Sequence, residues 1–352
     1  MTCSVCVADL PSELDDAFSK HVFLHRALLK DDMIELFSDP SMINVNLDVT
    51  VIGNDGNPEE GTGVGVMREV LTSFWQLVYH SLTVGTQEKV PCIRHELQKT
   101  QWEAIARVIV YGVKRYNYFP IFLSRAVIAS VLFGEGFIPS SFLLESFLLY
   151  VSQEERETIL IALGDKFDPN DGDLLDFLSN FKCFTKVTAG NISRVIHELA
   201  HQELLQKPRY IIDCFVPILS VLKAFPAFQN LQGLQEMYLE KKPTPKKIIK
   251  LLDANPQNEP ERMALDHLKR YIRSLDGQAV SQFFSFLTGS NVITCESILV
   301  TFSILEGAGR RPIIRTCGPI IELPSTYQSY SELAEEFSSV INEKGAWSFN
   351  IV

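Results

Sequence analysis

Cys317 is one of three places in the chain where residue types and spacing suit chemistry. It lies in the segment RPIIRTCGPIIEL, after a strand-like run and before a Gly-Pro pair that predicts a turn. A cysteine in a turn is partly exposed, and nearby cations favour the thiolate, which is the nucleophilic form. The cations close in sequence are Arg310, Arg311 and Arg315. The segment therefore suggests a nucleophilic cysteine, with an inert, small apolar residue as the alternative.

The second place is the pentapeptide HELAH at 197–201, which has the spacing of a zinc-peptidase helix. His197 and His201 could bind one Zn²⁺ from the same helix face, and Glu198 could polarise a water molecule. Both histidines point away from the apolar stripe of the predicted helix. A peptidase also needs a third ligand, but Lys207 stands where the metzincin form of the motif has histidine. We therefore interpret the pentapeptide as a polar helix face, with a zinc metallopeptidase as an alternative.

The third place is near the N-terminus, where four residues have the spacing of a two-cysteine, two-histidine zinc site. They are Cys3, Cys6, His21 and His25. Because the segment is acidic, such a site would be structural and would bind protein, not DNA. Stray cysteines near a chain end are the simpler interpretation, so we assign the chain no metal ion and no cofactor.

Helices must position most of these residues. Apolar residues recur at helical spacing in six segments, at 66–79, 101–116, 121–132, 141–151, 192–206 and 211–223. A strand with alternating apolar and polar residues precedes them at 44–53. An acidic, Gly-rich loop joins this strand to the first helix. The first part of the chain is therefore expected to be mainly helical.

The composition changes near Asp253. The stretch DANPQNEPER has two prolines, two asparagines and no large apolar residue, which is typical of a linker. Beyond it the pattern predicts two helices, then strands, then a closing helix that begins near Ser329. The expected segments are helices at 262–275 and 278–288 and strands at 297–304, 311–316 and 320–323. The sequence therefore predicts an α+β fold, with a large, mainly helical domain and a smaller α/β domain.

Composition and charge exclude several function classes. The 352-residue chain has 32 Lys and Arg against 43 Asp and Glu, a net charge of −11. This argues against a general nucleic-acid binder, because phosphate contacts need clustered cations. The seven cysteines form no evident disulfide framework, and the N-terminal segment lacks the apolar core of a secretory signal. The most apolar tract, 118–151, is interrupted by charged residues. We therefore expect an intracellular protein, cytoplasmic or nuclear, with neither nucleic acid nor membrane as a partner.

Several short motifs in the last part of the chain occur together in one known family. They are FFSFLTGSNVI at 283–293, Thr316-Cys317, Leu323-Pro324, Tyr327-Gln328-Ser329-Tyr330, and Phe349 at the fourth position from the end. This combination resembles the C-terminal lobe of HECT ubiquitin ligases. The resemblance implies that Cys317 accepts ubiquitin as a thioester and that Phe349 positions the tail against the donor ubiquitin. It also leads us to expect that Arg315 favours the thiolate and that Thr316 donates a hydrogen bond.

The resemblance extends more loosely towards the N-terminus. The stretch VNLDVTVIGNDGNPEEGTGVGVMREVLTSFW is similar to the family's opening strand, acidic Gly-rich loop and Arg-Glu helix, with Arg68-Glu69 in register. The chain departs from the family at Arg315, where many members have histidine. The implied architecture is bilobal, with an N-terminal extension at 1–39, an N-lobe at 40–253, a hinge at 254–260 and a C-lobe at 261–352.

The function implied by this resemblance is that of a HECT-type ubiquitin transferase. A charged conjugating enzyme would dock on the large lobe, within roughly 164–242, and pass ubiquitin to Cys317 by thioester exchange. A lysine amine of a protein substrate would then attack that thioester. A hinge would let the small lobe visit both partners in turn. The alternative from another class is a catalytically inactive HECT-like module that binds proteins as a scaffold.

Overall fold

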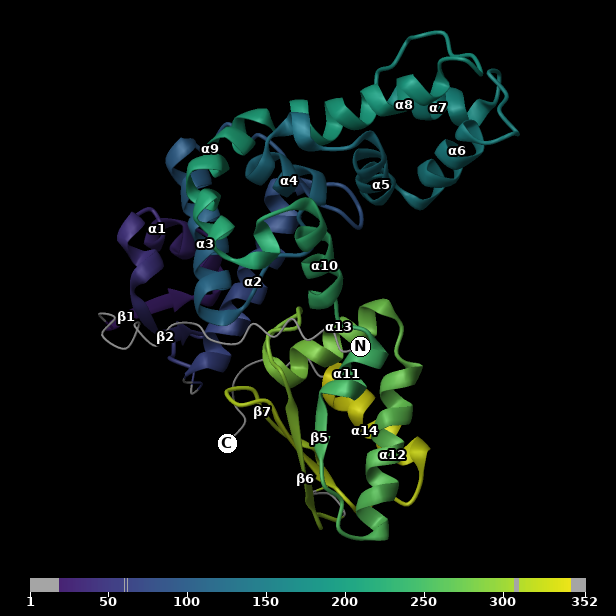
Figure 1. Cartoon of the computed structure of the whole chain (residues 1–352). Helices are drawn as coiled ribbons and strands as arrows, with labels where there is room; N and C mark the ends of the chain where they lie inside the picture. The colour runs from purple at the N-terminus through teal and green to yellow at the C-terminus, as the bar shows by residue number, and fades with distance from the viewer. Residues whose placement is uncertain (1–18, 60, 62, 307–309, 343–352) are drawn as a thin grey trace.

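Helices predominate in the computed structural model, which describes residues 19–59, 61, 63–306 and 310–342 (Figure 1). The strands of these residues form three small sheets, two of them two-stranded and one four-stranded. The predicted α+β class is thereby confirmed. Among the helices of these residues, none is both long enough and apolar enough to cross a membrane.

The elements up to residue 241 build a first cluster of buried apolar side chains. Its strands are β1 (Ser19–His25), β2 (Asn46–Ile52), β3 (Thr83–Val84) and β4 (Val90–Pro91). Its α-helices are α1 (Leu29–Leu36), α2 (Val64–Leu82), α3 (Lys99–Tyr116), α4 (Arg125–Phe133), α5 (Ser140–Tyr150), α6 (Gln153–Leu163), α7 (Gly172–Asn180), α8 (Ile192–His201), α9 (Arg209–Leu219) and α10 (Leu231–Lys241). Short 3-10 or π turns are η1 (Arg26–Leu28), η2 (Pro40–Asn44), η3 (Glu135–Phe137), η4 (Gln202–Gln206), η5 (Ser220–Ala224) and η6 (Pro226–Phe228).

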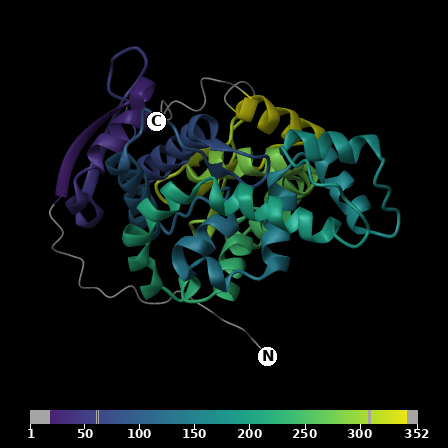
Figure 2. The ribbon, with the colours of Figure 1, turned by 90° about the horizontal axis from the view of Figure 1, so that it is seen from above.

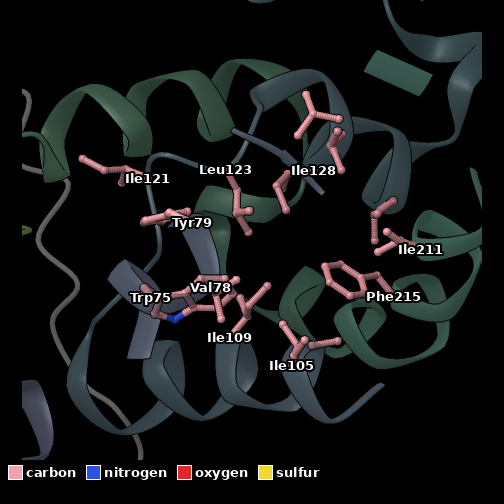
Figure 3. Packing of buried hydrophobic residues seen from close by; sticks show 14 of the residues in the cluster. Trp75, Val78, Tyr79, Ile105, Ile109, Ile121, Leu123, Ile128, Ile211 and Phe215 are labelled. Atoms are coloured by element: carbon pink, nitrogen blue, oxygen red, sulfur yellow. The ribbon is translucent and has the colours of Figure 1, made fainter. Parts of the chain in front are cut away.

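In this cluster α3 packs against both α2 and α9. Trp75 of α2 lies on the side of Ile109 of α3, and Phe215 of α9 lies beside Ile105 of α3 (Figure 3). All four side chains are at most 1% exposed. Burying a side chain of this size stabilises the fold by about 1.5–3 kcal/mol. This stabilisation explains why apolar residues recur at helical spacing in the sequence.

The described part of the predicted N-terminal extension belongs to the first cluster. β1 pairs in parallel with β2, from Ser19 opposite Asn46 to His25 opposite Ile52. Leu24 of β1 and Met33 of α1 are buried in the cluster. The segment 19–39 is therefore not separate from the core. The sequence did not indicate this, because a parallel pairing is a long-range contact that leaves no turn signal between its strands.

The helix predicted at 192–206 consists of α8 followed by a π turn. α8 passes directly into η4, where three consecutive residues, Glu203, Leu204 and Leu205, are buried. The wider π turn accommodates an extra residue here without ending the helix. Glu203 is paired there with Lys207 at 2.5 Å.

The remaining elements build a second cluster around a four-stranded sheet. They are α11 (Pro245–Leu251), β5 (Leu252–Ala254), α12 (Glu259–Ser274), α13 (Gly277–Thr288), β6 (Ile298–Ser303), β7 (Ile313–Arg315), β8 (Ile320–Pro324) and α14 (Tyr330–Asn342). The strand order is β5-β6-β8-β7, with β7 antiparallel to β8 and the other pairs parallel. In Figure 1, α11, α12 and α14 lie on one side of the sheet. Between them, the rings of Tyr271, Phe283 and Phe337 pack with centroids 5.5–6.1 Å apart.

The predicted linker at 254–260 does not separate the two clusters. β5 pairs with β6, and α12 packs in the second cluster, so this segment connects two elements of the same core. Its composition has another cause: Asn258 caps α12 through a hydrogen bond from the Glu261 amide, and a proline occupies the first turn. Apart from Val292, the buried apolar residues up to Tyr238 of α10 belong to the first cluster, and those from Ile248 of α11 onward belong to the second.

A partly buried lysine joins the two clusters at this point. Lys241 Nζ donates to Asn117 O at 2.5 Å, to Asn117 Oδ1 at 2.7 Å and to Ile293 O at 3.3 Å. The Ile293 amide donates back to Lys241 O at 2.9 Å. Nearby, Tyr118 Oη donates to Asn291 Oδ1 at 3.0 Å. The end of α10 is therefore tied both to the end of α3 and to the loop after α13.

The titration of Lys241 is predicted to affect stability. Burial lowers the pKa of Lys241 from 10.5 to about 8. The unfolded chain then binds more protons between these pH values, so the contribution of Lys241 to stability rises with pH. Between about pH 7 and about pH 9.5, the free energy of unfolding of the wild type should rise by about 1–2 kcal/mol relative to that of the non-titrating variant Lys241→Met. Denaturant unfolding of both proteins across this range measures the difference. The exposed neighbour supplies the control Lys242→Met, and a pH-independent difference for Lys241→Met would contradict the prediction.

Candidate functional site

Cys317 lies in the turn between β7 and β8. Arg315 pairs with Ile320 at the base of the turn, while Ile314 and Ile321 are buried in the second cluster. The base of the hairpin is therefore held by the core, and residues 316–319 project from it. The prediction of a turn at this position is confirmed, and Cys317 is exposed.

The other cysteines that the structure describes are less exposed. Cys214 is buried, and Cys92, Cys183 and Cys295 are partly buried. Burial raises the pKa of Cys214 and of Cys295, which disfavours their thiolates. Of the described cysteines, Cys317 is thus the one whose position suits reaction with a large partner.

The Cys317 turn packs against the first turn of α2. A Cβ atom placed on Gly65 would lie 2.5 Å from Thr316 Oγ1 and 3.0 Å from the Cys317 amide nitrogen. A Cβ atom on Gly63 would lie 3.6 Å from Cys317 Sγ. Arg68 Nη1 reaches the Thr316 carbonyl oxygen at 3.5 Å. We call Gly63, Gly65 and Arg68 the α2 seat.

The Thr-Gly turn after α13 meets the same part of α2. Gly289 ends α13 with a left-handed φ of 73°, a conformation that glycine adopts without strain. A Cβ atom on Gly289 would lie 2.9 Å from the Gly65 carbonyl oxygen. Thr72 Oγ1 donates to Gly289 O at 3.1 Å. Residues far apart in the sequence therefore converge on the first two turns of α2.

An ion-pair cluster holds the beginning of α2 in place. Arg26, which follows β1, donates to Glu59 Oε1 at 3.0 Å, to Glu59 Oε2 at 2.6 Å and to Glu69 Oε1 at 2.5 Å. The three side chains are between 12% and 19% exposed. Burial disfavours the charged guanidinium, but the two carboxylates outweigh it and raise the pKa of Arg26. Arg26 thus ties β1, the acidic loop and α2 together.

The predicted cluster of cations near Cys317 is partly engaged elsewhere. Arg310 pairs with Glu332 at 2.6 Å and with Glu336 at 3.2 Å on α14. Arg315 is exposed, with Nη2 3.9 Å from Glu322 Oε2. Arg315, two residues before Cys317, therefore shares its charge with a carboxylate. Phe349 lies outside the described residues.

The HELAH pentapeptide forms the polar face of α8, as predicted. Val195 and Leu199 are buried, while His197 Nδ1 pairs with Ser193 O at 2.6 Å. His201 Nε2 pairs with Glu135 Oε1 at 2.5 Å. The two histidines thus have separate partners, and no group of three or more potential metal ligands occurs among the described residues.

The two histidines of the predicted N-terminal zinc site also have partners of their own. His21 Nδ1 lies 2.8 Å from Asp48 Oδ2, and His25 Nδ1 lies 2.9 Å from Asp32 Oδ2. Cys3 and Cys6 lie outside the described residues. The structure therefore describes half of this predicted ligand set.

An open groove lies at the edge of the first cluster, along α7 and the loop that follows it. It has a volume of about 690 Å³ and is lined by residues between 167 and 189, apolar ones such as Phe167, Leu178 and Phe184 together with polar ones such as Asn170 and Lys186. Phe184 is 87% exposed. Figure 1 shows α6, α7 and α8 at the end of the molecule opposite the sheet that carries Cys317, and in Figure 2 the teal α6–α8 segment lies opposite the purple β1–α1 segment.

Comparison with known proteins does not assign the chain to a family. No model of a known protein family matches it, and no curated protein sequence matches it. The function is therefore inferred from the geometry of the site and from the motifs that converge there.

The Arg26 cluster is predicted to contribute strongly to stability. Removing Arg26 leaves the largely buried carboxylates of Glu59 and Glu69 without their cation. Arg26→Met should therefore lower the free energy of unfolding by about 3 kcal/mol. Denaturant unfolding measures the loss. Arg194→Met is the matched control, because Arg194 and Glu198 are exposed and 3.8 Å apart, and such pairs contribute about 0–1 kcal/mol. Equal losses in the two variants would contradict a special role for Arg26.

Proposed function

We propose that the chain is a HECT-type ubiquitin transferase that accepts ubiquitin on Cys317. The observation that supports this most is the convergence of separate motifs at one point. Thr288-Gly289, Thr316-Cys317 and Arg68-Glu69 are the pairs on which the family resemblance depends, and all three meet at the start of α2. A chance match of short motifs gives no reason for them to be neighbours in space.

The arrangement of the two clusters suits a bilobal transferase. In this proposal the first cluster is the core of the large lobe and the second is the core of the small lobe. The connection between α10 and α11, residues 242–244, takes the place of the hinge that the sequence suggested at 254–260. Rotation at this connection would carry the hairpin with Cys317 as a unit, because β7 and β8 belong to the sheet of the second cluster.

The proposed chemistry consists of two acyl transfers. In the first, the Cys317 thiolate attacks the carbonyl carbon of the thioester that joins ubiquitin to a conjugating enzyme. A new S–C bond forms, and the cysteine thiolate of the conjugating enzyme leaves. In the second, a substrate lysine amine attacks the new thioester, an amide bond forms, the Cys317 thiolate leaves, and the amine proton passes to solvent. Thr316 would donate a hydrogen bond at the turn, and Arg315 would favour the thiolate.

The groove beside Phe184 is our proposed docking surface for the conjugating enzyme. It lies within the region where the resemblance implies that this enzyme binds, and it is open, with apolar and polar residues in its lining. Leu175 of α7 lines the groove, and Leu160 and Ile161 of the adjacent α6 are also exposed; the three side chains have exposures of 48–52%. Such surfaces mark protein interaction sites, and exposed aromatic side chains often dominate their binding energy.

A loading assay with activating enzyme, conjugating enzyme and ubiquitin tests the transfer. The wild type should form a ubiquitin adduct that thiols cleave, whereas Cys317→Ser should form none that thiols cleave. Cys295→Ser, in which a partly buried thiol is removed, is the control and should load like the wild type. A thiol-sensitive adduct on Cys317→Ser would refute the assignment. Complete absence of an adduct on the wild type would favour the scaffold alternative.

The docking surface makes a separate prediction. Phe184→Ala should lower the rate of loading at limiting conjugating enzyme by about tenfold or more, because interface anchors contribute about 2 kcal/mol or more. Phe137→Ala is the matched control, since Phe137 is 77% exposed but lies outside the groove. Saturating conjugating enzyme should restore the Phe184→Ala rate. Equal rates for the two variants would place the docking surface elsewhere.

A further inference from the structure

We propose that the α2 seat holds the cysteine turn in a closed resting position, and that release from the seat controls the access of Cys317 to its donor. This inference rests on the proposed function, because it concerns regulation of the same thiol. Its physical basis, the contact between the two clusters at Gly65, does not depend on that function.

The contact at the seat is one of backbone against backbone. The atoms nearest to a Cβ on Gly65 are Thr316 Oγ1, the Thr316 carbonyl carbon and the Cys317 amide nitrogen, at 2.5, 3.0 and 3.0 Å. Two of these atoms belong to the main chain, which cannot rotate away as a long side chain can. Any side chain at position 65 must therefore displace the turn.

Hydrogen bonds around the seat hold the second cluster in the same position. Thr72 Oγ1 donates to Gly289 O at 3.1 Å and accepts from the Asn291 amide at 3.4 Å. Tyr118 Oη, from the first cluster, donates to Asn291 Oδ1 at 3.0 Å. Arg68 adds its longer contact of 3.5 Å to Thr316 O. Val292, next to Asn291, is buried in the first cluster and adds an apolar contact. The hydrogen bonds themselves are few, and each contributes only about 0.5–1.5 kcal/mol net, which suits a reversible contact.

The closed position separates Cys317 from the proposed docking groove. Figure 1 shows the groove-bearing α6–α8 segment and the sheet with β7 at opposite ends of the molecule. Thioester exchange needs the attacking sulfur within about 3–3.5 Å of the carbonyl carbon. In this proposal the turn must leave α2 to reach a donor bound at the groove. The fraction of molecules released from the seat therefore sets the rate of loading.

An engineered disulfide tests whether the seat is occupied in solution. A thiol introduced by Gly63→Cys would start from a Cβ position 3.6 Å from Cys317 Sγ, which is close enough for a bond after a small adjustment. Gly56→Cys is the matched control, because Gly56 has a similar φ of 82° and no atom within 4 Å of its Cβ position. Under a mild oxidant, peptide mass spectrometry should find the 63–317 bond about tenfold more often than the 56–317 bond.

Gly65→Ala then tests the closed contact itself. Alanine suits the first turn of a helix, so the first cluster should fold, while its Cβ displaces the Thr316–Cys317 turn. Added to Gly63→Cys, it should lower the yield of the 63–317 bond by about fivefold or more, since such overlap is costly. In the otherwise unaltered chain it should raise the initial rate of ubiquitin loading. Gly277→Ala, with no atom within 4 Å of its Cβ position, should change neither quantity.

The outcomes separate the two proposals. A 63–317 yield no higher than the 56–317 yield would overturn the closed seat, whatever the chain does with ubiquitin. If Gly65→Ala loads ubiquitin more slowly than the wild type or at the same rate, while the cross-linking is as expected, release of the turn from the α2 seat does not control the rate of loading. The expected cross-linking in a chain that never loads would refute ubiquitin transfer and the control of loading with it, while the closed contact would stand.

Discussion

The absence of a side chain at Gly65 is the constraint on which the site depends. It allows the Thr316–Cys317 turn and the end of α13 to approach the same helix at main-chain distance. The hydrogen bonds of Thr72 and Arg68 have their partners only because of this approach. Arg26, through Glu59 and Glu69, keeps the start of α2 where these contacts need it. One position without a Cβ thus organises residues from both ends of the chain.

Local patterns predicted most of the helices because each buries one apolar face. The segment expected at 101–116 is α3 (Lys99–Tyr116), and that at 278–288 is α13 (Gly277–Thr288). What the patterns missed depends on distant partners: β1 and β5 are short strands that exist through parallel pairing with β2 and β6. The linker at 254–260 was misplaced because helix capping uses the same residues, asparagine and proline, as a flexible connection.

The candidate site was predictable in part for the same reason. Cys317 was identified from its local turn and from the motif around it, both of which are visible in the sequence. The roles of Arg26 and Gly65 were not, because an ion pair between residues far apart and a close approach of main chains leave no periodic signal. In the same way, only the structure shows that His201 is paired with Glu135, because the two residues are far apart in the sequence.

The π turn after α8 has a consequence for the evolution of the molecule. Because η4 takes up about one residue more than a turn of α-helix, it can absorb an extra residue locally. In a regular α-helix the loss of one residue would rotate everything before it by about 100°. At η4 the same loss would convert the wide turn into a regular one and leave the faces of α8 nearly where they are. Chains that differ by one residue at this turn would therefore present the groove before α8 in the same direction.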